Sequence, residues 1–360
     1  MICSALLGRR MGALEGDEPL LAATVRSMEC ASSMLMSPLQ HWHARLNTPT
    51  WRGWVASLDF MLLRSHEHVS ACISHPTPSY VDALLRRGEL TAAEISANVP
   101  GLMMAGFETV AATLHWTLLH LALQPAAQER LHAELSSVLG RDADPCRESV
   151  QRMPYLRAVL REVRDTLRRQ LRTFWTPQRQ RAAPCRRRRR PRRQGNHFLP
   201  AICPLDVTPR TRLPQVQRLT PTAFSFLRRL PDPLEVQLPS GGAARLPSGA
   251  WLAFSPVGLA TDPAHVAAPT EFRPERWVDA AAVHRERAWP LFDHPLMRDG
   301  FSHGPRMCLG ARIAQLELWL AVSQIVRAHR LRVDGPRHYA VANHASTYPN
   351  PAPRIVFEPR

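Results

Sequence analysis

A single cysteine, held on a glycine-framed loop directly before an amphipathic helix, constrains this chain more than any other feature. The loop runs from Phe301 to Gly310 and places Cys308 two residues after Arg306. The residues that follow recur at the spacing of one apolar helical face: Leu309, Ile313, Leu316 and Leu320. A cation, backbone N–H groups and a helix N-terminus all lower the pKa of a nearby cysteine. The pattern therefore predicts a metal-binding thiolate in preference to an ordinary buried cysteine.

Five positions of this loop match a known pattern, Phe-x-x-Gly-x-Arg-x-Cys-x-Gly: Phe301, Gly304, Arg306, Cys308 and Gly310. The loop thus resembles the haem-binding loop of the cytochrome P450 family. The resemblance implies a mostly α-helical fold with a small antiparallel β part, and haem b as the cofactor. It also implies that Cys308 is the axial iron ligand, that Arg306 lies near a haem propionate, and that the other three positions frame the cofactor. A thiolate ligand pushes electron density toward oxygen at the iron and favours O–O cleavage.

A long stretch rich in alanine and leucine, residues 90–124, predicts a helix with the sequence AGFET at its centre. Small residues in mid-helix let a flat cofactor approach the backbone. The sequence resembles the oxygen-activating helix of the family. The resemblance implies that Ala105 and Gly106 line the haem, that Thr109 hydrogen-bonds to bound oxygen, and that Glu108 helps to deliver protons through water. A threonine in a helix can also simply donate to the carbonyl one turn earlier, so both roles stay open.

Of two further motifs of the family, the sequence matches one fully and the other only in part. The stretch Phe272–Trp277 resembles the Phe-x-Pro-x-Arg-Trp loop, whose arginine here is Arg276. In the family that arginine pairs with a helix carrying Glu-x-x-Arg, and arginine suits the role because it can donate a bidentate bond to a carboxylate. Glu162 occupies the acidic position, but Asp165 stands where the arginine is expected, and Arg168 restores the spacing only in a shifted register. The resemblance implies that Glu162 and Arg276 form a structural scaffold.

The net charge of +16 belongs to one segment of the chain. Residues 166–231 contain 17 arginines and a single acid, Asp206, together with many prolines, whereas the remaining residues are neutral overall. A run of like charges broken by prolines cannot bury a core. We therefore expect a disordered insert, or sequence foreign to the original domain. A patch that binds nucleic acid or other acidic partners is the weaker alternative, because interleaved aromatic residues are missing.

The resemblance covers residues 1–165 and 232–360 as two parts of one domain. The first is helical and includes the oxygen-activating helix, while the second contains a β-hairpin region, the cysteine loop and the terminal helix. Two stretches, Leu6–Gly12 and Thr50–Phe60, resemble the mitochondrial clan of the family. The front of the P450 fold is not covered, so the fold is expected to be incomplete at its N-terminus. The seven cysteines are scattered and lack CxxC spacing, which argues against a disulfide scaffold or a zinc site.

The function implied by the resemblance is monooxygenation, in which one oxygen atom from O2 enters a sterol or another lipophilic substrate. Electrons would come from a ferredoxin-type donor and its NADPH-dependent reductase, and no specific nucleic acid is expected. Clan analogy suggests a mitochondrial or membrane-associated protein, although the sequence shows no targeting segment and no apolar run of roughly 20 residues. Two alternatives remain. One is an inactive, misassembled relative with weak or no haem binding, and the other is recruitment of the arginine-rich segment by acidic partners.

Overall fold

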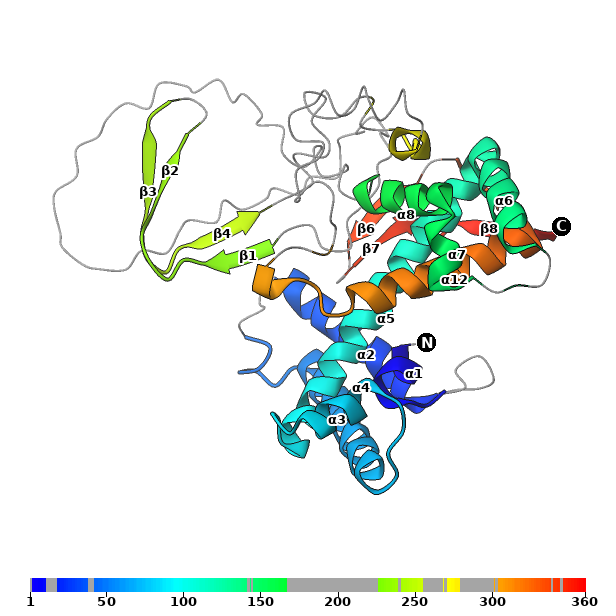
Figure 1. Ribbon diagram of the computed structural model, residues 1–360. Helices are drawn as coiled ribbons and strands as arrows, with labels where there is room; N and C mark the ends of the chain where they lie inside the picture. The colour runs from blue at the N-terminus through cyan, green and yellow to red at the C-terminus, as the bar shows by residue number, and fades with distance from the viewer. Residues whose placement is uncertain are drawn as a thin grey trace.

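The chain forms long helices with short antiparallel strand pairs at their margins (Figure 1). The structure is a computed structural model. It describes residues 2–10, 18–37, 42–140, 143, 145–166, 226–238, 241–254, 268, 271–278, 301, 304–337, 339–343 and 346–360. The mostly helical class with small antiparallel sheets, expected from the sequence, is confirmed for this part of the chain. None of the described helices combines the length and apolar character needed to span a bilayer.

The helices divide around one central member, α5 (Ala92–Leu123). The helices before it are α1 (Ile2–Leu7), α2 (Pro19–Met36), α3 (Pro49–Ser74) and α4 (Tyr80–Arg87). Those after it are α6 (Pro125–Leu139), α7 (Arg147–Gln151), α8 (Pro154–Thr166) and α12 (Ala311–Ala328). In Figure 1, α5 runs diagonally between the two groups. Its start is fixed by a capping box, in which Glu94 N donates to Thr91 Oγ1 at 3.2 Å and Thr91 N donates to Glu94 Oε2 at 2.8 Å.

Helix α5 joins two apolar clusters. Its first half packs through Ile95 and Val99 against side chains of α1 and α3. Its second half packs through Leu119 and Leu121 against α6, α8 and α12. Burying each such side chain contributes about 1.5–3 kcal/mol relative to leaving it exposed. The position of α5 is therefore fixed from both sides, which matters because it carries the predicted oxygen-activating residues.

Helix α12 packs through a different face from the apolar one noted in its sequence. The residues buried against α5, α6 and α8 are Leu318, Val322 and Val326. Leu309 and Leu316, which belong to the apolar face noted in the sequence, remain 66% and 40% exposed. Apolar residues occur on more than one face of this helix, so spacing alone could not choose between them.

The strands form four two-stranded antiparallel sheets within the described residues. Their pairs are β1 (Phe226–Arg229) with β4 (Trp251–Phe254), β2 (Leu234–Gln237) with β3 (Ala243–Leu246), β5 (His329–Asp334) with β8 (Arg354–Pro359), and β6 (Ala340–Asn343) with β7 (Thr347–Asn350). The β2–β3 turn contains Gly241 and Gly242, both with φ near +85° (85° and 86°), a backbone region that favours glycine. Strand β1 begins at Phe226, so ordered structure starts before residue 232. Residues 167–225 lie outside the described part, and the insert stays a prediction.

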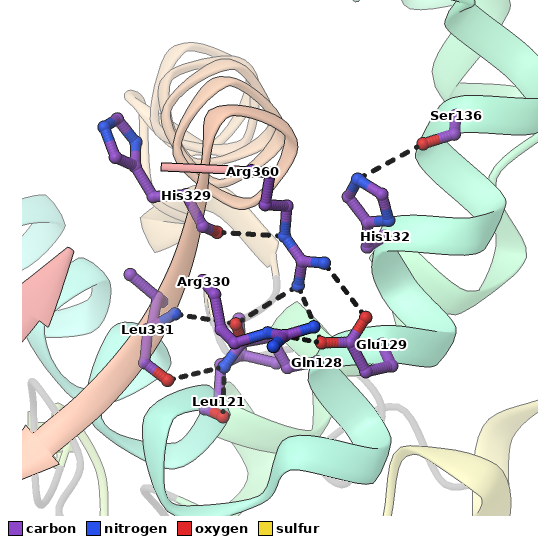
Figure 2. A network of polar contacts seen from close by, with 9 residues as sticks. All are labelled: Leu121, Gln128, Glu129, His132, Ser136, His329, Arg330, Leu331 and Arg360. Atoms are coloured by element: carbon purple, nitrogen blue, oxygen red, sulfur yellow. Dashed lines mark hydrogen bonds and ion pairs between the residues drawn. The ribbon is translucent and has the colours of Figure 1, made fainter. Parts of the chain in front are cut away.

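A polar network fastens the strands β5 and β8 to the start of α6 (Figure 2). The side chain of Gln128 is 1% exposed, and its Nε2 donates to the carbonyls of Leu121 and Leu331, both at 3.0 Å. Its Oε1 accepts from Leu331 N at 2.7 Å. Beside it, Glu129 accepts two hydrogen bonds from Arg360, at 2.9 and 3.0 Å. The strands that follow α12 are thus anchored to the α5–α6 corner.

Candidate functional site

The cysteine loop is shaped by backbone hydrogen bonds around a short 3-10 helix, η3 (Gly304–Arg306). Gly304 has a φ of +74°, a backbone region that L side chains rarely adopt and that favours glycine. Met307 N donates to Gly304 O at 3.0 Å, and Cys308 N donates to Phe301 O at 2.8 Å. These bonds turn the chain so that the side chain of Cys308 is exposed.

The exposed thiol lies directly before α12, whose N-cap is Gly310. The partial positive charge of a helix N-terminus favours a thiolate at such a position. Helix α12 packs against α5, and Figure 1 shows the loop from η3 reaching α12 at the side of α5. The neighbours of Cys308 are apolar and exposed, Met307 at 54% and Leu309 at 66%. Arg306 ends η3, and its side chain lies outside the described part of the chain.

These features fit a haem, the cofactor that the loop implies. Gly310 has an ordinary φ of −81°, and no atom lies within 4 Å of the place where its Cβ would be. The protein's own packing therefore does not require glycine there, whereas a flat group approaching the backbone would. Within the described residues no group of three or more His, Cys, Asp and Glu side chains could hold a metal ion. A lone thiolate suits an iron whose other ligands come from a porphyrin.

The motif on α5 presents its residues on different faces. Thr109 and Ala105 are both exposed and lie one turn apart, and Thr109 Oγ1 donates to Ala105 O at 2.7 Å. Gly106 faces α1, because a Cβ added there would lie 2.7 Å from Cδ1 of Ile2 in that helix. Close packing of α1 thus accounts for the glycine, and its contact with haem stays a prediction. Ala105 and Thr109 form the face that a cofactor could approach.

Glu108 joins α5 to the β6–β7 hairpin. Its side chain is 7% exposed, and Oε1 accepts from Ser346 N at 2.8 Å. Tyr348 lies close by, with its hydroxyl donating to the backbone carbonyl of Glu108 at 3.4 Å. Burial, with the negative charge of Glu108, raises the pKa of Tyr348 to about 12. These hairpin partners could not be predicted from the sequence, because residues 238 positions apart share no spacing signal.

The structure brings Glu162 and Arg276 together in the core. Both side chains are 0% exposed, and Arg276 Nε donates to the two carboxylate oxygens of Glu162 at 3.1 Å each. Arg276 belongs to η2 (Pro274–Trp277), the 3-10 turn that follows Arg273. Trp277 Nε1 donates to Glu162 Oε2 at 2.7 Å, and Arg273 N donates to Oε1 at 2.9 Å. Each oxygen of the buried carboxylate is therefore bonded to donors of one short segment.

A second set of contacts holds η2 and the residues before it against the helices. Tyr155 OH donates to Glu275 Oε1 at 2.6 Å, which links the start of α8 to η2. The ring of Phe272 stacks on that of His120 in α5, with centroids 4.9 Å apart and planes 7° from parallel. Burial lowers the pKa of His120 to about 3, so this imidazole is neutral at physiological pH. The segment around Arg276 is thus fixed to both α5 and α8.

Comparison with known proteins agrees with this geometry. A sequence model described as "Cytochrome P450" matches residues 1–169 and 215–350. The mitochondrial 1,25-dihydroxyvitamin D(3) 24-hydroxylase of Mus musculus is 26% identical over 343 residues, which cover 92% of this chain and 53% of that protein. The mitochondrial sterol 26-hydroxylase of Homo sapiens is 26% identical over 346 residues, with coverage of 92% and 53%. The chain thus spans about half the length of these curated relatives.

Among solved structures, the haem domain of cytochrome P450DA superposes with a TM-score of 0.71 at 19% identity, covering 100% of this chain and 65% of that one. A second cytochrome P450 crystal structure superposes with the same TM-score, 0.71, at 16% identity. At these identities the likeness shows the fold. Because the family model matches well over half of the residues, and because the cysteine loop, α5 and the Glu162–Arg276 pair are arranged as described, the chain belongs to the cytochrome P450 family.

Proposed function

We propose that the chain acts in a haem-dependent monooxygenase that inserts one oxygen atom from O2 into a lipophilic substrate. The observation that carries the proposal is the cysteine loop, with Cys308 exposed at the start of α12 in a chain of the cytochrome P450 family. Haem b supplies O2 activation at its iron when it is bound. The chain's own residues would hold the haem and would supply the protons that the reaction needs.

Cys308 would hold the iron, and the backbone bond from Cys308 N to Phe301 O holds the loop at this residue. Gly304 shapes the turn before it, and Gly310 leaves room beside it. Arg306 would pair with a propionate, since a guanidinium suits a carboxylate. On α5, the Ala105–Thr109 face would lie over the cofactor, as the small side chain of Ala105 permits.

Thr109 and Glu108 would handle protons. The hydroxyl of Thr109 donates to Ala105 O in the structure, and rotation about χ1 would free it to donate toward a bound ligand. Glu108 lies one residue earlier as a buried carboxylate with a fixed orientation, because Ser346 N holds its Oε1. We assign to Glu108 the delivery of protons by way of water.

The relatives suggest the substrate class and the compartment. They are named as mitochondrial hydroxylases of vitamin D and sterols, which supports a sterol or similar lipid as substrate, and mitochondria as the location. A ferredoxin-type donor with an NADPH-dependent reductase would supply electrons. The inactive and the acidic-partner alternatives gain no support from these relatives.

The proposal is tested by the spectrum of the carbonyl complex. The chain is expressed with haem supplied, reduced under carbon monoxide, and recorded in the Soret region. We expect the strongly red-shifted band of a thiolate-ligated haem, and its absence would contradict the proposal. With ferredoxin, reductase and a sterol panel, labelled O2 should leave one labelled oxygen in the product.

A further inference from the structure

The hairpin of β6 and β7 is held against α5 at two places, and the first of them is the acid of the motif on α5 (Figure 1). Ser346, directly before β7, donates its backbone N–H to Glu108 Oε1 at 2.8 Å, and both residues are buried. Two turns later on the same face of α5, the ring of His115 meets the ring of Tyr348 edge-on, with centroids 6.2 Å apart. The start of β7 therefore lies against α5 between Glu108 and His115.

The bond between Ser346 and Glu108 depends on the charge of the carboxylate. A hydrogen bond to an ionised acceptor is roughly twice as strong as a bond between neutral groups. The titratable side chains of the second contact are neutral at physiological pH, because burial and the charge of Glu108 raise the pKa of Tyr348 to about 12, and burial lowers the pKa of His115. The strength of the first contact therefore follows the charge of Glu108.

The hairpin lies beside the face of α5 that carries Ala105 and Thr109. Successive residues of an α-helix are rotated by about 100° around its axis, so Glu108 points about 100° away from Thr109. Ala105 and Thr109 remain exposed, so Ser346 and the strand after it border this face without covering it. A hairpin that moves away from Glu108 would open one side of this face, while the position of Thr109, which α5 itself sets, would not change.

We propose that Glu108 is a charge-dependent latch for the β6–β7 hairpin. The ionised side chain holds Ser346, and the strand that follows it, against α5, and the protonated side chain weakens that hold. The latch rests on the contacts described above. Its link to catalysis rests on the proposed function, in which Glu108 delivers protons: each proton that Glu108 takes up would loosen the hairpin beside the Ala105–Thr109 face, and each proton that it gives up would tighten it.

The test measures hydrogen exchange of the Ser346 amide in the full chain without haem. Glu108→Gln is neutral, as the protonated acid is, and keeps an oxygen that can accept, so we expect exchange about tenfold faster. Glu108→Ala removes the acceptor and should accelerate exchange further. The matched control is Glu94→Gln on the same helix, where Thr91 N donates to the Glu94 carboxylate at 2.8 Å. Glutamine also suits that capping box, so exchange at Ser346 should not change.

A second arm tests the proton dependence. After correction for the intrinsic effect of pH on exchange, acidification should accelerate exchange at Ser346 in the unmodified chain more than in Glu108→Gln. Because every other titratable group is present in both chains, the difference isolates Glu108.

Equal exchange at Ser346 in Glu108→Gln and in the unmodified chain would overturn the proposal, as would an equal acceleration in Glu94→Gln. If Glu108→Ala does not fold, the comparison of Glu108→Gln with Glu94→Gln still decides. If the unmodified chain with haem supplied gives no red-shifted carbonyl band, the proposed function fails, and the exchange rates still test the latch. If the band is present and exchange does not respond to the charge of Glu108, the latch fails and the proposed function stands.

Discussion

The Glu162 carboxylate and the Cys308 thiol are held in opposite ways. Glu162 is fully buried and its oxygens accept from a guanidinium, an indole and a backbone N–H. Cys308 is exposed, and its backbone N–H donates to the carbonyl of Phe301. Removing a partner from a buried pair leaves a charge that water cannot solvate, whereas an exposed thiol can change with little cost. The first region should govern stability and the second should govern chemistry.

The largest effect is expected from Glu162→Gln. The change leaves Arg276 buried beside a neutral amide, which should cost about 3–5 kcal/mol of unfolding free energy. Urea unfolding at neutral pH measures the loss. The matched control is Glu358→Gln, which breaks an exposed pair with Arg332 at 3.1 Å and should cost less than about 1 kcal/mol. Similar losses in both variants would remove the distinction between the two regions.

A smaller effect concerns His120, whose ring stacks beside the scaffold segment on Phe272. Burial lowers its pKa from 6.5 to about 3. Between these two pH values the imidazole is therefore protonated in the unfolded chain and neutral in the folded chain. The unfolding free energy is therefore highest above pH 6.5, and below pH 6.5 it falls by about 1.4 kcal/mol per pH unit. Unfolding curves at pH 7 and 5.5 should show the fall.

His120→Phe is the control, because it keeps an aromatic ring but cannot titrate. Burial also lowers the pKa values of His68 and His115, and these residues remain in the variant. The difference between the two pH slopes therefore isolates His120. Identical slopes would show that the imidazole is protonated in the folded chain.

The smallest effect on stability is expected from Cys308→Ser. Because the side chain is exposed, the unfolding free energy should change by about 0.5 kcal/mol or less. The red-shifted carbonyl band should nevertheless vanish, since a serine hydroxyl does not replace the thiolate. A stability loss comparable to that of Glu162→Gln would mean that the thiol is part of the core.

Local sequence patterns were sufficient to predict the features that residues close in sequence form among themselves. The glycines and the cysteine predicted a loop at a helix start, and the structure has Cys308 before α12. The alanine-rich stretch predicted α5, and Thr109 donates to Ala105 one turn earlier, the simpler of its two sequence-based roles. Such features follow from φ preferences and from i, i+4 geometry, which a sequence records directly.

Other features could not be predicted because tertiary packing creates them. Nothing in the sequence links Glu108 with Ser346, or Gly106 with Ile2, since these contacts depend on how α5 meets the hairpin and α1. The sequence also did not show which face of α12 is packed, because apolar residues occur on several sides and only the neighbouring helices select one. The stacking of Arg161 on Trp277 was missed for the same reason.

The Gln128 network also has a consequence for folding during translation. Gln128 bonds to Leu331 across 203 positions, so the corner formed by α5 and α6 is translated long before the strand that fastens to it. At about 5–20 residues per second, the ribosome needs roughly 10–40 s to cover that distance. Throughout that interval Leu119 and Leu121 lack the α12 side chains that later cover them. A nascent chain of this kind should therefore depend on chaperones until α12, the helix after Cys308, has emerged.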